Sequence, residues 1–155
     1  MSCINEQIWI GSYRDACNES FLKKNGITHI LCCAREFDGL PANLHTSDYT
    51  YYRVPIVEEP VGKNKFEAWF RKASAKLNTW VSEGHHVLVH CYAGISRSVS
   101  TVITYFILYK GYSFDQAYNE VKRGRKQMKP YTEFIPVLKS FERTRNKTRK
   151  NLKRK

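Results

Sequence analysis

The sequence contains no apolar stretch long enough to cross a membrane, because Ser and Thr interrupt the longest one, near residues 99–109. Its first residues, Met-Ser-Cys-Ile-Asn-Glu, lack a signal-peptide pattern, and position 2 is not the glycine that myristoylation requires. The five cysteines are odd in number and do not suggest a disulfide framework, and no Cys/His cluster has zinc-site spacing. These absences predict a reduced protein of the cytoplasm, the nucleus or both, without a transmembrane segment, a metal or a cofactor.

Acidic residues are absent from the stretch 143–155, where eight of thirteen residues are Lys or Arg. The chain has 155 residues and a formal net charge of +12, so most of its excess positive charge lies in that stretch. The length and the 42% hydrophobic content suit one domain with a buried core. We therefore predict a domain at residues 1–142 and a basic tail at 143–155. The tail could bind nucleic acid, acidic lipid or an import receptor, or be only a solvated extension of the last helix.

Apolar residues alternate between strand and helix patterns along the chain. Short apolar runs predict strands at residues 7–11, 27–33, 49–57 and 86–91. Helical spacing predicts helices at 14–25, 65–83, 96–110 and 113–123, and a last helix that starts at Pro130. The helix at 96–110 is apolar on most sides, which predicts that it is buried. Strands that alternate with helices indicate an α/β layered fold.

The stretch from Val87 to Ser98 is the most informative part of the sequence. An apolar strand leads into Cys91, then into a loop of small residues, and then into a helix that begins near Arg97. The five residues between Cys91 and Arg97 can wrap one tetrahedral anion, because the loop N–H groups point inward above the positive end of the helix. The Arg97 guanidinium can close this ring through a bidentate contact with two anion oxygens.

Cys91 and Arg97 each have an ordinary interpretation as well. A lone cysteine at a strand end is usually a small buried hydrophobic residue, and an arginine at a helix start can be a surface charge. The helix dipole disfavours a cation at that end, however, so an arginine there suggests that an anion lies between them. The same positive field would keep Cys91 as a thiolate. A thiolate in contact with a bound phosphate is a nucleophile in contact with its electrophile.

The string His-Cys-x-x-Gly-x-x-Arg-Ser at residues 90–98 resembles the signature of the protein tyrosine phosphatase superfamily, and its Ala-Gly-Ile-Ser-Arg-Ser version resembles the dual-specificity phosphatases. Further similarity covers nearly all of residues 4–142, in segments such as 9–12, 22–30, 52–56 and 121–130. The resemblance implies a small, single-domain (atypical) member with a central mixed, mostly parallel sheet flanked by helices. It also implies hydrolysis of phosphotyrosine, phosphoserine and phosphothreonine in a phosphoprotein substrate through a phosphocysteine intermediate.

The resemblance assigns roles around the loop. Cys91 would attack phosphorus, Arg97 would bind the equatorial oxygens of the transition state, and Ser98 would donate to the thiolate. The expected phosphate-binding residues are Cys91, Tyr92, Ala93, Gly94, Ile95, Ser96 and Arg97. His90 would shape the loop by hydrogen bonding and favour the ionised cysteine, or would be an ordinary buried histidine. Arg125 would frame the pocket, or would be a surface charge in a basic run.

The sequence departs from the family at the general acid, which the family supplies as an aspartate after the strand that here ends at residues 54–57. No aspartate lies in that loop, and Glu58 occupies the matching position with Glu59 beside it. Glutamate has the same chemistry but reaches about 1.5 Å further. We expect Glu58 to be the acid, with Glu59 or neither residue as the alternatives. Asp48 and Asp38 are weaker candidates, since Asp48 lies at the opposite end of the strand.

Three classes of function stay open at this stage. An active protein phosphatase is favoured, because the loop has no extra Lys or Arg of the kind that meets a lipid with several phosphates. The second class is a lipid or RNA phosphatase steered by the basic tail. The third is a weakly active phosphate-binding interaction module, since the usual aspartate is missing. The sequence also leaves open whether Cys32 or Cys33 lies near enough to Cys91 to form a disulfide on oxidation.

Overall fold

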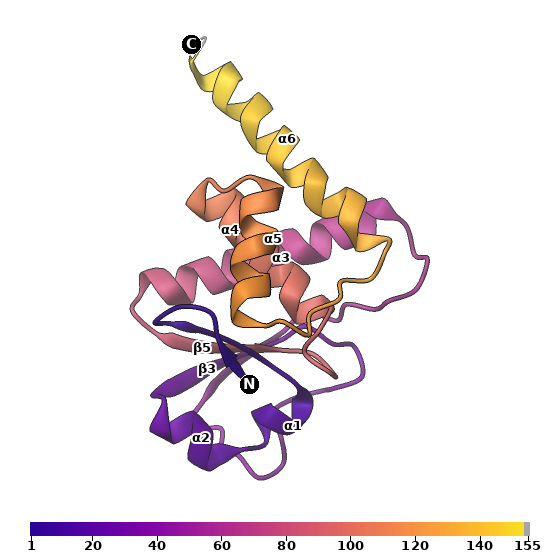
Figure 1. Cartoon of the computed structure of the whole chain (residues 1–155). Helices are drawn as coiled ribbons and strands as arrows, with labels where there is room; N and C mark the ends of the chain where they lie inside the picture. The colour runs from indigo at the N-terminus through magenta and orange to yellow at the C-terminus, as the bar shows by residue number, and fades with distance from the viewer. Residues whose placement is uncertain (154–155) are drawn as a thin grey trace.

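The computed structural model describes residues 1–153, which fold around a five-stranded sheet (Figure 1). The strands are β1 (Ser2–Cys3), β2 (Ile8–Gly11), β3 (Ile27–Cys32), β4 (Thr50–Arg53) and β5 (His86–His90). They lie in the order β1-β2-β5-β3-β4, and every neighbouring pair is parallel except β1 and β2. The prediction of an α/β fold with a mixed, mostly parallel sheet is therefore confirmed.

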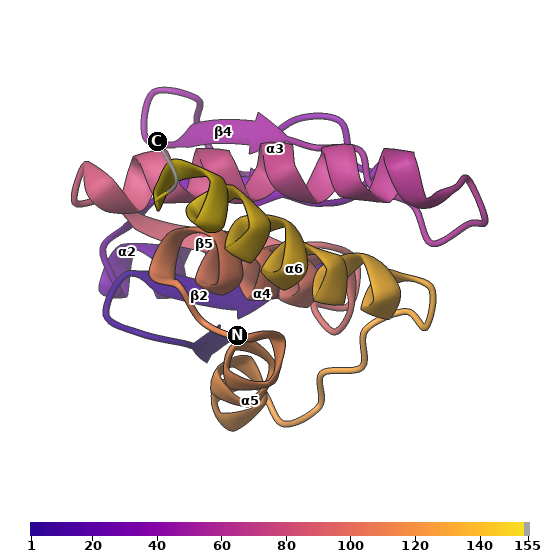
Figure 2. The same cartoon turned by 90° about the horizontal axis from the view of Figure 1, so that it is seen from above.

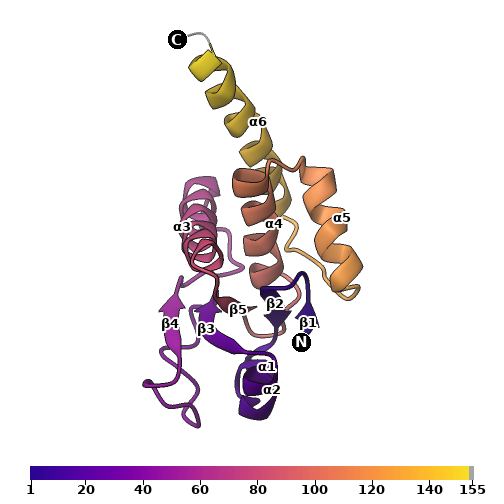
Figure 3. The ribbon, with the colours of Figure 1, turned by 90° about the vertical axis from the view of Figure 1, so that its left-hand side faces the viewer.

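Helices cover both faces of the sheet. They are α1 (Tyr13–Ala16), α2 (Glu19–Lys24), α3 (Lys63–Ser82), α4 (Arg97–Lys110), α5 (Phe114–Gly124) and α6 (Phe134–Lys153). The first two lie on one face and the other four on the opposite face (Figure 3). Seen from above, α4 lies between α3 and α5 and beneath α6 (Figure 2). No helix within residues 1–153 combines the length and the apolar character that a membrane span needs.

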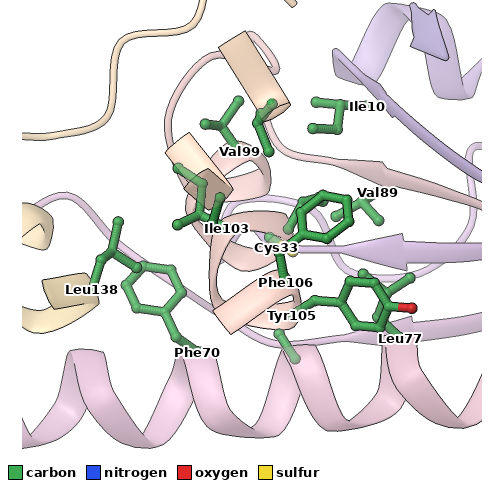
Figure 4. Close-up of a cluster of buried hydrophobic side chains, with 14 of the residues drawn as sticks. Ile10, Cys33, Phe70, Leu77, Val89, Val99, Ile103, Tyr105, Phe106 and Leu138 are labelled. Carbon is green, nitrogen blue, oxygen red and sulfur yellow. The ribbon is translucent and has the colours of Figure 1, made fainter. Parts of the chain in front are cut away.

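Helix α4 forms the centre of the helical layer, and every residue from Arg97 to Ile107 is buried. Its side chains Val99, Ile103 and Phe106 pack between the sheet and the neighbouring helices α3 and α6 (Figure 4). A helix that is apolar all round needs neighbours all round, so the predicted burial of this helix is confirmed. Tight packing fixes the helix and thereby fixes the position of its first residue, Arg97.

Two local predictions are wrong near the edges of the sheet, and one strand was not predicted. The helix predicted at 14–25 is two short helices, because Asn18 caps α2 by accepting a hydrogen bond from the Phe21 N–H (3.3 Å). Strand β4 ends at Arg53 instead of residue 57, because Pro55 has no N–H to extend the ladder. Strand β1 was not predicted, and its two residues pair antiparallel with β2.

Helix α6 begins at Phe134, later than predicted, and runs without a break through residue 142 to Lys153. Its buried residues end at Phe141, and the later turns project from the body (Figure 1). Arg145 reaches back to the body, because its Nη1 donates to the carbonyls of Ile107 (2.8 Å) and Tyr112 (2.5 Å) at the end of α4. Residues 143–153 of the predicted tail are thus helical, and residues 154–155 lie outside the described residues.

Candidate active site

The loop after β5 forms a small pocket at the carboxyl edge of the parallel strands. Strand β5 is central and buried, which places the next residue, Cys91, at that edge. Residues 92–96 form the loop, and Arg97 begins α4. The pocket has a volume of about 190 Å³ and is lined by Glu58, Cys91, Tyr92, Ala93, Ile95, Ser96, Arg97 and Lys129. We call it the catalytic pocket.

Cys91 is buried at the base of the catalytic pocket, with 2% of its surface exposed. The Gly94 N–H donates to its sulfur (3.3 Å), and the Ser98 hydroxyl lies 3.3 Å from the same atom. Hydrogen-bond donors around a thiol stabilise its ionised form. Ser98 is fully buried in the first turn of α4, so its hydroxyl is fixed beside the sulfur.

The loop backbone carries N–H groups that have no partner in the protein. Within residues 1–153, the N–H groups of residues 92, 93, 95 and 96 donate to no protein acceptor. Gly94 adopts φ +71°, and a Cβ atom there would lie 2.4 Å from the Gly11 carbonyl oxygen, so only glycine fits. Unpaired N–H groups beside a helix N-terminus form an anion-binding site.

Arg125 holds the loop from outside. Its side chain is buried, Nε donates to the Gly94 carbonyl (2.5 Å), and Nη2 donates to the Ala93 carbonyl (3.4 Å). Its Nη1 donates to the Ser2 hydroxyl (2.8 Å), which ties the N-terminal strand to the loop. The N–H and C=O of a trans peptide point in opposite directions. Carbonyls turned toward Arg125 therefore leave the neighbouring N–H groups facing away from it, and Arg125 frames the loop.

The hydrogen bonds that hold the Arg97 guanidinium all involve its Nη1. Its Nη1 donates to both carboxylate oxygens of Glu36 and to the Ile56 carbonyl (3.0 Å). Burial alone would lower the pKa of Arg97, but its hydrogen bond with Glu36 and the nearby charges raise this pKa overall. The buried Nε has no hydrogen-bond partner among residues 1–153. A buried guanidinium nitrogen without an acceptor is costly, so this atom requires one from outside the protein.

Glu36 is the functional residue that sequence reasoning missed. It lies in the loop after β3, and 61 positions separate it from Arg97. One signal could have indicated it, because Glu36 follows a buried strand of a parallel sheet. The carboxyl ends of such strands meet at one edge, which is also where Cys91 lies.

His90 is buried behind the loop. Its Nδ1 lies 3.1 Å from the Cys91 carbonyl, so Nδ1 carries the proton and donates. Burial lowers the pKa of His90 to about 4, which leaves the ring neutral at pH 7. The hydrogen bond can hold the loop, but a neutral ring supplies no charge that would favour a thiolate at Cys91.

Glu58 is the carboxylate that the structure places at the catalytic pocket. It lines the pocket, whereas Glu59 does not. The Glu58 side chain is exposed, and no hydrogen bond or ion pair within residues 1–153 holds it. Asp38 pairs instead with Arg53 (3.7 Å), and Asp48 precedes β4, so neither lines this pocket.

The cysteines are all free thiols, and one of them packs against Cys91. Cys32 shares a small buried cluster with Cys91, whereas the Cys33 sulfur lies 3.4 Å from the Thr101 hydroxyl beneath α4. Burial raises the pKa of the Cys32 and Cys33 thiols. In the described part of the chain, no cysteine belongs to a group of three or more His, Cys, Asp or Glu that could hold a metal ion.

The family model for the dual specificity phosphatase catalytic domain matches residues 8–144. The chain belongs to this family. It is a protein phosphatase of the tyrosine/serine/threonine class, and the strand, loop and helix at residues 86–110 lie inside the matched region of this phosphatase domain.

Similar proteins support this assignment. Dual specificity protein phosphatase 1B of Arabidopsis thaliana is 31% identical over 144 residues, which are 93% of this chain and 83% of that protein. Protein phosphatase Slingshot of Drosophila melanogaster is 33% identical over 138 residues, which cover 89% of this chain but only 13% of that longer relative. The crystal structure of human DUSP28 has a TM-score of 0.84 over 96% of this chain and 99% of that one. Its 24% identity means that this likeness concerns the fold.

Proposed function

We propose that this phosphatase hydrolyses phosphotyrosine, phosphoserine and phosphothreonine in proteins through a phosphocysteine on Cys91. The observation that carries the proposal is the buried Arg97, whose Nε lacks an acceptor within residues 1–153 and which lines one pocket with the buried Cys91 and a loop that carries four unpaired N–H groups. One phosphoryl group would supply oxygen acceptors to all of these donors at once. It would also bring phosphorus to the Cys91 sulfur.

The chemistry takes two steps. In the first, the Cys91 thiolate attacks phosphorus, the bond from phosphorus to the substrate oxygen breaks, and Glu58 donates a proton to that oxygen. In the second, water attacks phosphorus, Glu58 takes a proton from the water, and the phosphorus–sulfur bond breaks to release phosphate. The Gly94 N–H and the Ser98 hydroxyl, both 3.3 Å from the sulfur, stabilise the departing thiolate.

The size of the catalytic pocket supports action on all three phosphorylated side chains. A volume of about 190 Å³ accommodates a phosphoryl group and little of the side chain that carries it. Selection between a long phosphotyrosine and a short phosphoserine needs a deep slot, and this pocket is small.

Turnover of an aryl phosphate from pH 5 to 8 tests the mechanism. We expect Cys91→Ser to be inactive, and Glu58→Gln to lower kcat by about 10²–10⁴-fold, because general acid catalysis contributes that much. Glu59→Gln is the matched control and should behave like the wild type. Activity that persists in Cys91→Ser would contradict the covalent mechanism.

A phosphate-binding module of weak activity is the second candidate. One observation favours it: Glu58 replaces the family's aspartate and is held by no hydrogen bond within residues 1–153. A loosely held acid loses part of its catalytic advantage. If Glu58→Gln and the wild type are equally slow, this candidate replaces the first.

A lipid or RNA phosphatase steered by the tail is disfavoured by distance. Arg145 binds the C-terminal end of α4, whereas Cys91 lies at its N-terminal end, and 14 helical residues span about 20 Å. Anions gathered by the tail would not be delivered to the catalytic pocket. We infer that residues 143–153 bind a separate acidic partner, which is a nucleic acid, an acidic lipid surface or an import receptor.

A further inference from the structure

A second pocket, of about 400 Å³, lies beside the catalytic pocket. Arg35, Arg53 and Lys65 line it together with Trp69 and apolar residues that include Val57. We call it the cationic pocket. No residue to which a catalytic role is given above belongs to its lining.

The two pockets share one wall. Val57 lines the cationic pocket, and the next residue, Glu58, lines the catalytic pocket. The Ile56 carbonyl accepts hydrogen bonds from Arg97 Nη1 (3.0 Å) and from the Arg35 N–H (3.3 Å), so one residue from each pocket meets at this oxygen. An extended peptide advances about 3.3 Å per residue. A substrate held at Arg97 therefore brings its neighbouring residues close to the cationic pocket.

Positive charge in the cationic pocket is poorly neutralised. No carboxylate lines the pocket, and Arg35 and Lys65 form no ion pair within residues 1–153. Arg53 has Asp38 at 3.7 Å, but the Asp38 side chain is 99% exposed. An exposed pair of this kind is weak and yields readily to a better-placed anion.

Arg53 is positioned in advance for such an anion. Its Nη1 donates to the carbonyls of Arg35 (3.2 Å) and Phe37 (2.8 Å), which holds the guanidinium against the loop after β3. In the described part of the chain, its Nε and Nη2 donate to no protein acceptor. A guanidinium that is already fixed loses little freedom when it binds an oxyanion.

We propose that the cationic pocket binds a second anionic side chain of the substrate, close in sequence to the phosphorylated residue in the catalytic pocket. This inference rests on the proposed phosphatase function and names its substrate class, proteins with clustered anionic residues. Three cations match a doubly charged phosphate better than a single carboxylate. Trp69 and Val57 offer apolar surface to the stem of the bound side chain.

A peptide series tests the proposal. Each peptide carries one phosphotyrosine, either alone or with a phosphoserine or a glutamate placed one to four residues away on either side. The value of kcat/KM is measured for the wild type and for Arg35→Gln/Lys65→Gln. The control variant, Lys24→Gln/Lys63→Gln, removes the same charge from exposed positions, and Lys63 lies in the same helix α3 but lines another pocket.

We expect at least one spacing at which the second phosphate raises kcat/KM about tenfold in the wild type and the control, as charge-assisted hydrogen bonds would. The gain should fall below about twofold in Arg35→Gln/Lys65→Gln, and glutamate should give a smaller gain than phosphoserine. An equal glutamate gain would identify a carboxylate as the ligand. All three proteins should hydrolyse a small aryl phosphate equally, because the catalytic pocket is unchanged.

The proposal is overturned if no spacing gives a gain, if the gain survives in Arg35→Gln/Lys65→Gln, or if the control loses it equally. Wild-type protein that hydrolyses no substrate would instead refute the proposed phosphatase function. In that case, the affinity of Cys91→Ser for the same peptides, with and without the Arg35 and Lys65 changes, still decides whether the cationic pocket binds anions.

Discussion

Both ends of α4 are surrounded by positive charge, but only one end forms a pocket with it. At the N-terminal end, Arg97 and Arg125 are buried and held by hydrogen bonds beside the phosphate loop. At the C-terminal end, most cations of α6 beyond Phe141 are exposed to solvent. Fixed donors bind an anion without reorganising, whereas mobile surface cations must be ordered first. The placement of cations, more than their number, therefore makes an anion site.

One arginine at each end sharpens this contrast. Arg145 donates to the Ile107 and Tyr112 carbonyls near the negative end of the α4 dipole, where a cation is stabilised. Arg97 begins the same helix at its positive end, where a cation is destabilised, and its Nε has no acceptor within residues 1–153. Carbonyl oxygens of the protein satisfy Arg145, whereas the buried Arg97 Nε, which has no acceptor among residues 1–153, can take one from a bound phosphoryl group.

In this comparison of the two ends of α4, the larger effect should come from replacing Arg97 with lysine and the smaller one from replacing Arg145. Arg97→Lys should lower kcat/KM for an aryl phosphate by about 10²–10³-fold, because lysine cannot make a bidentate contact with the phosphoryl oxygens. Arg145→Lys keeps a cation at the carbonyls and should change kcat/KM by less than about twofold. Steady-state kinetics on both variants checks the comparison. An Arg97→Lys protein that retains a tenth of the wild-type kcat/KM would contradict the bidentate role of Arg97.

His90 should make the free energy of unfolding of the protein depend on pH. Its pKa drops from 6.5 to about 4 on folding, because the charged ring is disfavoured by burial. The unfolded chain binds more protons between these values, so the free energy of unfolding falls as the pH decreases from 6.5 to 4, by about 3 kcal/mol. His90→Asn keeps a donor for the Cys91 carbonyl and removes this titration.

Denaturant unfolding at several pH values measures the difference. The free energy of unfolding of the wild type, taken relative to that of His90→Asn, should decrease by about 3 kcal/mol between neutral pH and pH 4. His45→Asn, at an exposed histidine, is the control for the exchange of histidine for asparagine. If His90→Asn loses stability as steeply as the wild type, His90 does not titrate in this range.

Glu36 should have a smaller effect, because it acts through Arg97. Glu36→Gln removes the charge that holds Arg97 Nη1, so we expect kcat/KM to fall about tenfold, mainly through a higher KM. Affinity for vanadate, a phosphate analogue, should fall in parallel. The matched control is Glu67→Gln, which breaks a surface pair with Arg71 (3.4 Å) and should leave kinetics unchanged. Unchanged KM and vanadate affinity in Glu36→Gln would remove Glu36 from a positioning role.

The parts of the site that could be predicted are the local ones. Cys91 and Arg97 lie six positions apart, and a strand, a loop and a helix in direct succession bring them together. Glu36 could not be predicted in the same way, because only the parallel pairing of β3 with β5 places its loop beside Arg97. The cationic pocket also combines side chains from separate segments, including Arg53 and Lys65, so no sequence window contains it.

The fold class followed from alternation of strands and helices, whereas element ends depended on single residues. Apolar periodicity alone predicted one helix at 14–25, but the Asn18 side chain offered the backbone a cap and restarted the helix. Pro55 shortened β4 in a similar way by removing a donor. Helix α6 passed residue 142 because its sequence contains no Gly or Pro at that point to stop it.

The smallest catalytic effect is expected from the exposed cations near the C-terminal end of α4. Arg143→Gln/Lys147→Gln/Lys150→Gln removes three exposed cations of α6. Turnover of an aryl phosphate should stay within about twofold of wild type, because the roughly 20 Å length of α4 exceeds the Debye length of about 8 Å at physiological salt. A larger loss would place the tail within the catalytic domain.

The same variant should lose affinity for an acidic partner. An RNA oligonucleotide and phosphatidylserine vesicles are suitable probes, because both bind cations through phosphate groups. For the RNA, each lost phosphate contact should make the logarithm of the binding constant fall less steeply with the logarithm of the salt concentration. Lys24→Gln/Lys63→Gln should leave that slope nearly unchanged, which separates the tail from general basicity. Binding that is unaffected by the triple variant would leave the tail as a solvated helix end, and the phosphate loop as the anion site of α4.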